Sequence, residues 1–381
     1  MASGMPTEVR VLIWARAVNQ LGGFSLAFLT VLLADSFGAG LAIAGVVSAA
    51  FGLATIPSRL AGGLAAVSAI LLGLAFELFE PPSQSLIADS VAPADRASAF
   101  GLLTTALAVG SLGAGVIADV VGRWSLRWLF VADAATGIAC AVMVLFTLAP
   151  DSVAKRPSEP DVPRDGIVSP WRDRALLIAT VSGTVFALIA MMFLVALPLS
   201  LSAVGLRPSD AGLLMAASTA TLVLARPITR TGPLATMPHG PIFAIGYVLM
   251  GIGMLGYAAA HTLPTLVVPT AAYSLGNLLV MGRSFAVVSE LAPPVASARY
   301  LAVYGLSWGV ATLIAPLVAT WLIDASGPGL LWTFTAGLSG VMAAGQPWLV
   351  RWIGRIGRER VDLDVIRSTN LVAERYDAVS I

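Results

Sequence analysis

Charged side chains are scarce in this 381-residue chain, in which Asp, Glu, Lys and Arg make up 11%. A soluble domain carries about a quarter charged residues. Cysteine occurs once, at Cys140, so the chain can form no internal disulfide and no cysteine-based metal site. The net charge of +1 leaves no basic excess for nucleic acid. We therefore expect no soluble domain and no nucleic-acid partner.

Signatures of enzymes are also missing. The two histidines, His239 and His261, lie too far apart to indicate a metal site, and no phosphate-binding Gly-x-x-x-x-Gly-Lys loop is present. We expect neither a metal nor another cofactor, and no enzymatic activity.

Apolar residues are abundant, at 57% of the chain with a mean hydropathy of +0.88. Many apolar runs are near twenty residues long, and a helix of about that length crosses a hydrocarbon layer roughly 30 Å thick. The pattern predicts an all-α polytopic membrane protein embedded in a lipid bilayer. About eleven apolar segments lie near residues 11–33, 41–57, 61–79, 98–119, 128–149, 175–204, 211–228, 241–260, 264–288, 300–324 and 329–353.

One long polar interval, 151–174, divides the chain. Its prolines and basic residues prevent it from crossing the membrane or continuing a helix. We predict an N-terminal bundle at 1–150, a cytoplasmic linker at 151–174, a six-helix C-terminal bundle at 175–353 and a cytoplasmic tail at 354–381. Basic residues flank the spans in the linker, in the tail and at Arg10 and Arg16, so both termini are predicted to be cytoplasmic.

The two halves repeat each other weakly. Residues 87–93 match 287–293, and each stretch is followed by an arginine, Arg96 or Arg299, and then by a Gly-Leu pair. A repeat about 200 residues apart, with a polar linker between, is typical of transporters built from two pseudo-symmetric bundles around a central site.

Three stretches resemble the major facilitator superfamily of secondary transporters, in particular its bacterial drug-efflux-like branch. They are residues 80–89, which begin Glu80-Pro81-Pro82, residues 96–102, and residues 292–306, which end Tyr304-Gly305-Leu306. The resemblance implies a monomeric transporter in the bacterial plasma membrane. It also implies proton-coupled efflux of small amphipathic compounds, with access alternating between the two sides of the membrane.

The first half departs from that pattern. Glu80 follows Pro57 by 23 residues, whereas Arg283 follows Pro227 by 56. The difference is about one span plus a loop, so the first half is expected to lack one helix. Residues 41–79 as one continuous helix would measure about 58 Å, and we predict that they do not form two ordinary crossings with a normal loop.

Ionisable and amide groups within apolar segments are costly and mark candidate sites. Glu77 and Glu80 share a helix face and are candidates for proton or cation handling; alternatively, they lie in the membrane interface. Arg16, Asn19 and Gln20 fall in the first span, which lines the cavity in the family. Arg16 alternatively extends to the cytoplasmic interface.

Four residues of the second half complete the candidate pathway. Arg283 is expected to pair with a carboxylate or receive an anionic substrate group. Asn277 stands where related efflux proteins often have a glutamate. Tyr304 and Trp308 are candidates for the cavity wall, while Trp321, Trp332, Trp348 and Trp352 are expected as interface anchors and packing residues.

The remaining charges are expected at helix ends. Asp89, Arg96, Glu290 and Arg299 should cap helices and gate the closed state through ion pairs. Asp133 is expected near the outer end of its span, as an interfacial residue.

Two alternatives to efflux remain open. The chain can be a degenerate family member without transport activity, as the missing helix favours. It can also take up an anionic metabolite through Arg16 and Arg283.

Overall fold

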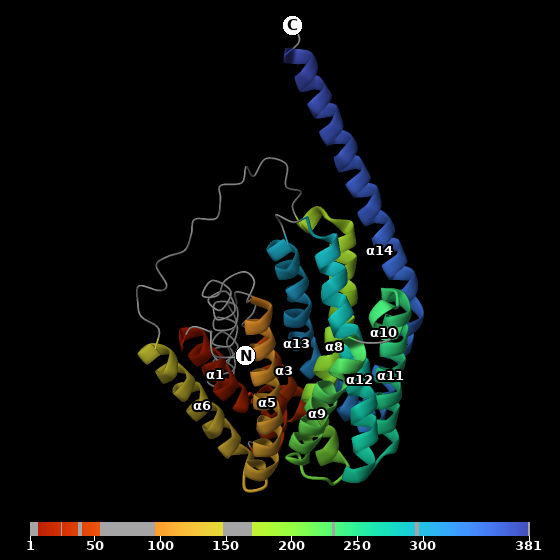
Figure 1. Ribbon diagram of the computed structural model, residues 1–381. Helices are drawn as coiled ribbons and strands as arrows, with labels where there is room; N and C mark the ends of the chain where they lie inside the picture. The colour runs from red at the N-terminus through yellow and green to blue at the C-terminus, as the bar shows by residue number, and fades with distance from the viewer. Residues whose placement is uncertain are drawn as a thin grey trace.

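The computed structural model describes residues 7–23, 25–36, 40–53, 96–147, 170–230, 233–293 and 297–379. Within these ranges every regular element is a helix (Figure 1), which confirms the predicted all-α fold. Seven of the helices are long and apolar enough to cross a membrane. Residues 54–79 of the predicted segment 41–79 lie outside the described residues.

The N-terminal helices differ from the prediction at the first span. These elements are α1 (Thr7–Leu21), α2 (Ser25–Val31), the π-helical turn η1 (Leu32–Ser36), α3 (Leu41–Leu53), α5 (Arg96–Gly122) and α6 (Leu126–Thr147). Residues 11–33, predicted as one span, form two helices that are interrupted at Gly22 and Gly23. Paired glycines lower helix propensity, and their N–H groups close a tighter turn onto Asn19 and Gln20.

The C-terminal helices follow the predicted segments within a few residues. They are η2 (Pro170–Arg172), α8 (Arg174–Ala203), α9 (Asp210–Arg230), α10 (Pro233–Thr236), α11 (His239–Ala259), α12 (Leu263–Leu291), α13 (Ser297–Ser326) and α14 (Pro328–Val379). The short α10 was not predicted. The last span and the predicted tail form one helix of 52 residues, which extends beyond the bundle (Figure 1).

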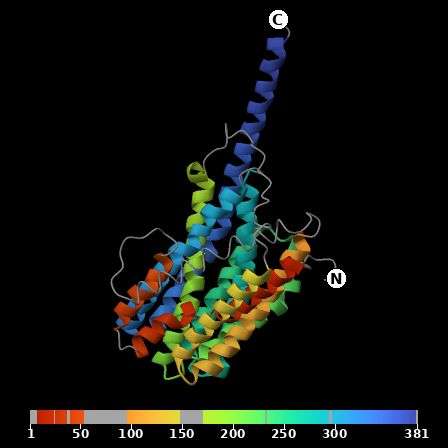
Figure 2. The same ribbon diagram turned by 90° about the vertical axis from the view of Figure 1, so that its left-hand side faces the viewer.

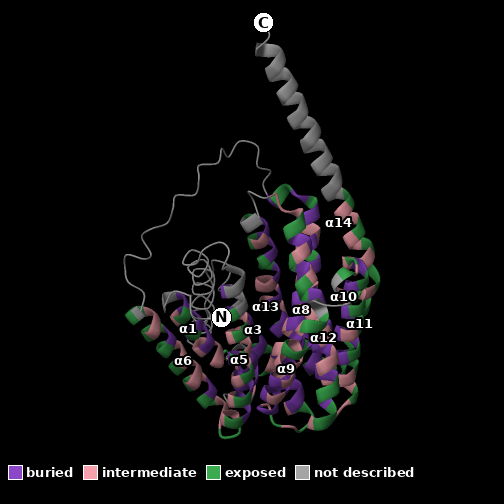
Figure 3. Ribbon diagram, viewed as in Figure 1, coloured by how far each residue is buried: buried purple, intermediate pink, exposed green. Residues whose placement is uncertain are grey.

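Helix α8 forms the centre of the largest core. Buried residues occupy 72% of its span, against 11% for α6, and Figure 3 shows the same contrast. Asp173 caps α8 by accepting hydrogen bonds from the backbone of Ala175 and Leu176. The hydroxyl of Tyr300 donates to the same carboxylate at 2.7 Å, which fastens the start of α13 to the start of α8.

The tryptophans separate into two groups. Trp332 is 2% exposed and packs against Tyr257, as a core residue does. Trp321 and Trp348 are 68% and 69% exposed, as expected for anchors in the membrane interface.

Three close helix pairs join the described N-terminal helices to the C-terminal ones, and the least extensive of them is α2 on α8. Helix α5 lies beside α9 (Figures 1 and 2), and α3 packs on α13. At the first crossing, a Cβ added to Gly115 would lie 2.5 Å from the carbonyl oxygen of Gly212. At the second, a Cβ on Gly45 would collide with Thr320. The first crossing requires glycine because the two backbones approach too closely for any side chain. At the second, the Thr320 side chain fills the space beside Gly45.

Replacing Gly115 with alanine tests the first crossing. We expect Gly115→Ala to destabilise the protein by about 1–3 kcal/mol, because the added methyl group must push α9 away. Thermal unfolding of the purified protein in detergent measures this. Gly137→Ala on α6 is the matched control, since a Cβ there meets no atom within 4 Å. Equal stability of the two variants would contradict the close crossing.

Candidate functional site

A cavity of about 200 Å³ lies between the two groups of helices. Its wall comes from the end of α1 and from α5 on one side, and from α8 and α9 on the other. The lining residues are Gln20, Gly23, Ser111, Ala114, Gly115, Ala118, Phe193, Leu194, Met215, Ser218 and Thr219. None of these described lining residues is charged. Gly115, which forms the α5–α9 crossing, is itself part of the wall.

The polar groups of this wall are an amide and three hydroxyls. The Ser218 hydroxyl lies 2.7 Å from the buried Ser274 hydroxyl of α12, which orients it. Thr219 donates to the carbonyl oxygen of Met215 at 3.1 Å, so its own oxygen remains able to accept a hydrogen bond. Phe193 stacks on Tyr273 with a centroid distance of 4.1 Å. The wall thus offers fixed apolar surface with a few neutral hydrogen-bonding groups.

The predicted residues of the first span separate in the structure. Gln20 lines the cavity and packs against Gly110 of α5. Asn19 is half-buried and is not among the lining residues. Arg16 is 5% exposed and interacts electrostatically with Cys140 on α6. It therefore lies near α6 and is not among the lining residues of this cavity.

Arg283 and Asn277 on α12 also lie away from the cavity. Arg283 donates through Nη2 to the carbonyl oxygen of Leu234 at 2.7 Å, and so ties α12 to α10. The Asn277 side-chain oxygen is buried and has no hydrogen-bond partner among the described residues.

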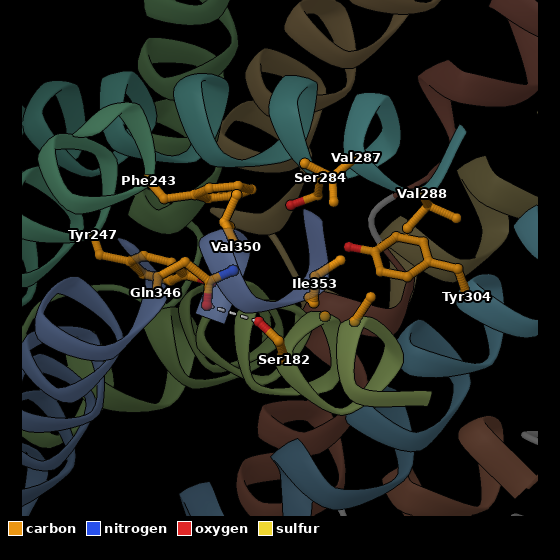
Figure 4. Close-up of a pocket in the computed structure, with 12 residues that line it drawn as sticks. Ser182, Phe243, Tyr247, Ser284, Val287, Val288, Tyr304, Gln346, Val350 and Ile353 are labelled. Atoms are coloured by element: carbon orange, nitrogen blue, oxygen red, sulfur yellow. Dashed lines mark hydrogen bonds between the residues drawn. The ribbon is translucent and has the colours of Figure 1, made fainter. Parts of the chain in front are cut away.

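Tyr304 and Trp308 lie inside the C-terminal helices. Tyr304 is 2% exposed and borders a second, smaller cavity of about 20 Å³, which Figure 4 shows. In that cavity the hydroxyl of Ser182 donates to Gln346 at 2.9 Å. Trp308 packs edge-on against Phe186 of α8. The described contacts of these two side chains include those with Gly183 and Phe186 of α8 and Phe285 of α12.

The predicted helix-end residues are described only in part. Glu290 lies 3.2 Å from Nε2 of His239, so it joins the end of α12 to the start of α11. Arg299 is exposed at the start of α13. Arg96 is the first residue of α5, but its side chain lies outside the described part, as do Glu77, Glu80 and Asp89.

An ion pair that the sequence analysis did not single out lies at the other end of α5. Arg123 makes a two-pronged contact with the buried Asp119, at 2.9–3.2 Å. The hydrogen bonds and charge of Asp119, with a further contribution from Asp210 of α9, raise the pKa of the Arg123 guanidinium above its ordinary value. An aspartate four residues before an arginine on a helix was the available signal.

The sequence comparison decides the family. The sequence model of the Major Facilitator Superfamily matches twice, over residues 7–199 and over residues 179–362. The chain belongs to the major facilitator superfamily. A match in each half agrees with the internal repeat of this transporter family.

Several curated members of the superfamily are similar to this transporter. "Multidrug resistance protein MdtH" of Aeromonas salmonicida is 28% identical over 75% of this chain and 72% of its own length. The protein of the same name from Klebsiella pneumoniae is 26% identical over 90% of this chain and 81% of its own. The "Uncharacterized MFS-type transporter YhjO" of Bacillus subtilis is 23% identical over 72% and 69%. These relatives place the chain in the drug-efflux-like branch.

Solved transporters share the fold. A crystal structure of the peptide transporter POT superposes with a TM-score of 0.69 at 16% identity, over 93% of this chain and 95% of the other. The POT family transporter PepTSo gives a TM-score of 0.71 at 12% identity, over 92% and 99%. At this identity the likeness concerns the arrangement of the helices alone.

The ion pair at the end of α5 is testable by a double-mutant cycle. We expect Arg123→Ala to lower the thermal unfolding temperature, because it leaves the buried carboxylate of Asp119 without its bidentate donor. Adding Asp119→Asn to that variant should restore most of the loss, since the amide carries no charge. Strictly additive losses in the double variant would show that the two side chains do not interact.

Proposed function

We propose that this transporter exports small amphipathic compounds in exchange for protons, and that the cavity between the halves holds the substrate. The observation that carries the proposal is the neutral wall of that cavity. It combines Phe193, Leu194 and Met215 with the amide of Gln20 and three hydroxyls. Such a wall suits a ligand with a large apolar surface and few hydrogen-bonding groups.

The positions of the arginines favour this substrate class over an anionic metabolite. An anion would need a cation at the cavity wall. Arg16 lies against α6, and Arg283 donates to the backbone of α10. The name of the MdtH relatives, a multidrug resistance protein, also supports amphipathic substrates.

The contacts between the halves favour a working transporter over a degenerate one. Alternating access requires two bundles that touch along smooth surfaces and can rock against each other. The crossing at Gly115 with Gly212 provides such a surface, because the two backbones meet there without side chains between them. The cavity opens directly beside this crossing and would change shape as the halves move.

The proposal includes the topology. We propose a monomer in the bacterial plasma membrane, with bundles at 1–150 and 175–353 and with both termini in the cytoplasm. The basic residues of the linker and of the tail support this orientation, because positive charge flanking the spans stays on the cytoplasmic side.

A bulky side chain in the cavity tests the proposed substrate site. We expect Ser111→Trp to abolish accumulation of a fluorescent amphipathic dye in everted membrane vesicles with an acidic interior, because the indole fills the cavity. Val109→Trp is the matched control on the same helix, since Val109 is 65% exposed and faces away from the cavity.

Both variants must reach wild-type levels in the membrane. Unchanged dye accumulation by Ser111→Trp would place the substrate elsewhere. Preference of the wild-type protein for a dianionic dye would contradict the neutral site, and absence of movement of any tested compound would favour the degenerate family member.

A further inference from the structure

Asp133 occupies an unusual position among the carboxylates of the described spans. It lies seven residues after the start of α6 and fourteen before its end. In the seven described helices that can cross a membrane, every other carboxylate lies within one turn of a helix end. These other residues are Asp119, Asp210, Glu290 and Asp324. A carboxylate within a span is costly to keep ionised, and such residues mark proton relays in membrane proteins.

The side chain of Asp133 packs against the break between α1 and α2. A Cβ added to Gly22 would lie 2.7 Å from Oδ1 of Asp133 and would collide with the hydroxyl of Thr136. Gly22 is therefore held directly against this face of α6. Gln20, two residues before Gly22, and Gly23, directly after it, line the cavity between the halves. One glycine thus separates the carboxylate from the cavity wall.

The same break is the place where the first span changes its neighbours. Helix α1 packs on α5 and α6, whereas α2 packs on α8 of the other half as well as on α3 and α6. Phe28 and Val31 of α2 are fully buried in the core that α8 organises. A shift of α8 relative to α1 would therefore bend the chain near Gly22 and Gly23, and Asp133 touches that break.

The charged groups around this position are few, and on α6 itself Arg127 lies six residues before Asp133. Helix α1 presents Arg16 to α6 near Cys140, which is two turns from Asp133, or about 10 Å along the axis. Helix α5 contributes Asp119 and Arg123, which pair with each other near its end. The described side chains of α2 carry no charge.

We propose that Asp133 is the residue that takes up and releases the coupling proton of this transporter, and that its charge acts on the cavity through the hinge at Gly22 and Gly23. The inference rests on the proposed proton-coupled export. A proton from the outer solution adds to a carboxylate oxygen and forms an O–H bond. That bond breaks when the proton leaves to the cytoplasm, and no oxidation or reduction takes place.

The charge change has a direct structural consequence. Neutral Asp133 is compatible with close packing against Gly22 and the apolar face of α6. An ionised carboxylate gains more from hydration than a neutral one, so ionisation of Asp133 favours the arrangement in which the hinge opens toward the cavity. The state of one carboxylate thereby biases the position of α2 relative to α1.

The test separates proton-driven transport from exchange. Asp133→Asn should lose dye accumulation driven by a pH gradient in everted vesicles, while dye exchange between the two sides without a gradient continues. Asp324→Asn is the matched control, an aspartate exposed at the end of α13, and it should retain both activities. Glu80→Gln tests the other candidate for proton handling: loss of gradient-driven accumulation there, with retention in Asp133→Asn, would assign the coupling proton to Glu80.

Three outcomes would overturn the inference. The first is that Asp133→Asn still accumulates dye in response to a pH gradient. The second is that Asp133→Asn reaches a normal level in the membrane but loses both dye exchange and dye accumulation. The third is that gradient-driven accumulation depends on Glu80 and not on Asp133. If Asp133→Asn fails to fold, Asp133→Glu replaces it. A shifted pH profile of transport then supports the inference, and an unchanged profile overturns it.

Failure of the proposed function is recognised separately. If the wild-type protein moves no dye, export is wrong, and infrared difference spectra on acidification still test the residue. Protonation of a carboxylate produces a carbonyl band of the carboxyl group. If Asp324→Asn keeps this band and Asp133→Asn lacks it, the result supports proton uptake by Asp133. The same band in Asp133→Asn overturns it.

Discussion

The close crossing of α5 and α9 is the constraint on which the site depends. Backbone meets backbone there, because neither Gly115 nor Gly212 has room for a side chain. Helix pairs in a membrane gain little from the hydrophobic effect, so close backbone packing is what holds them together. The crossing brings Ser111 of α5 opposite Ser218 and Thr219 of α9, and the cavity is the space left between them. It also brings Asp210 near the Asp119–Arg123 pair at the end of the same two helices.

Much of the fold follows from the sequence, since the described C-terminal spans are apolar runs bounded by proline, glycine or charge. The first span was predicted incorrectly for a physical reason. Hydropathy stays high from Val11 to Leu33, and it does not register that Gly22 and Gly23 end one helix and begin another. The break matters because α1 packs on α5 and α6, whereas α2 also reaches α8 of the other half. The prediction for residues 41–79 continues into a part of the chain that the structure does not describe.

The candidate site was less accessible to sequence reasoning. Gln20 could be predicted because an amide within an apolar run needs a polar environment. The hydroxyls of the wall were not identified, since serine and threonine in spans commonly bond to their own helix, as Thr219 does. Arg283 and Tyr304 were assigned to the pathway from their position along the chain. Which side of a helix faces the other half depends on contacts between distant segments, and periodicity alone does not supply these.

The cavity wall is neutral, whereas the carboxylate of Asp133 lies outside it. This separation connects the proposed substrate site with the proposed site of proton uptake. A charged wall would favour one sign of substrate and would bind it at a cost in desolvation of both partners. The described wall avoids that cost and places few geometric demands on a ligand. The coupling proton must then bind outside the cavity wall, at a titratable group that changes its charge without contacting the substrate. A carboxylate behind the glycine hinge meets this requirement, because Gly22 contacts Asp133 on one side while Gln20 and Gly23 form the cavity wall on the other. Substrate range and energy coupling can therefore vary independently in this arrangement.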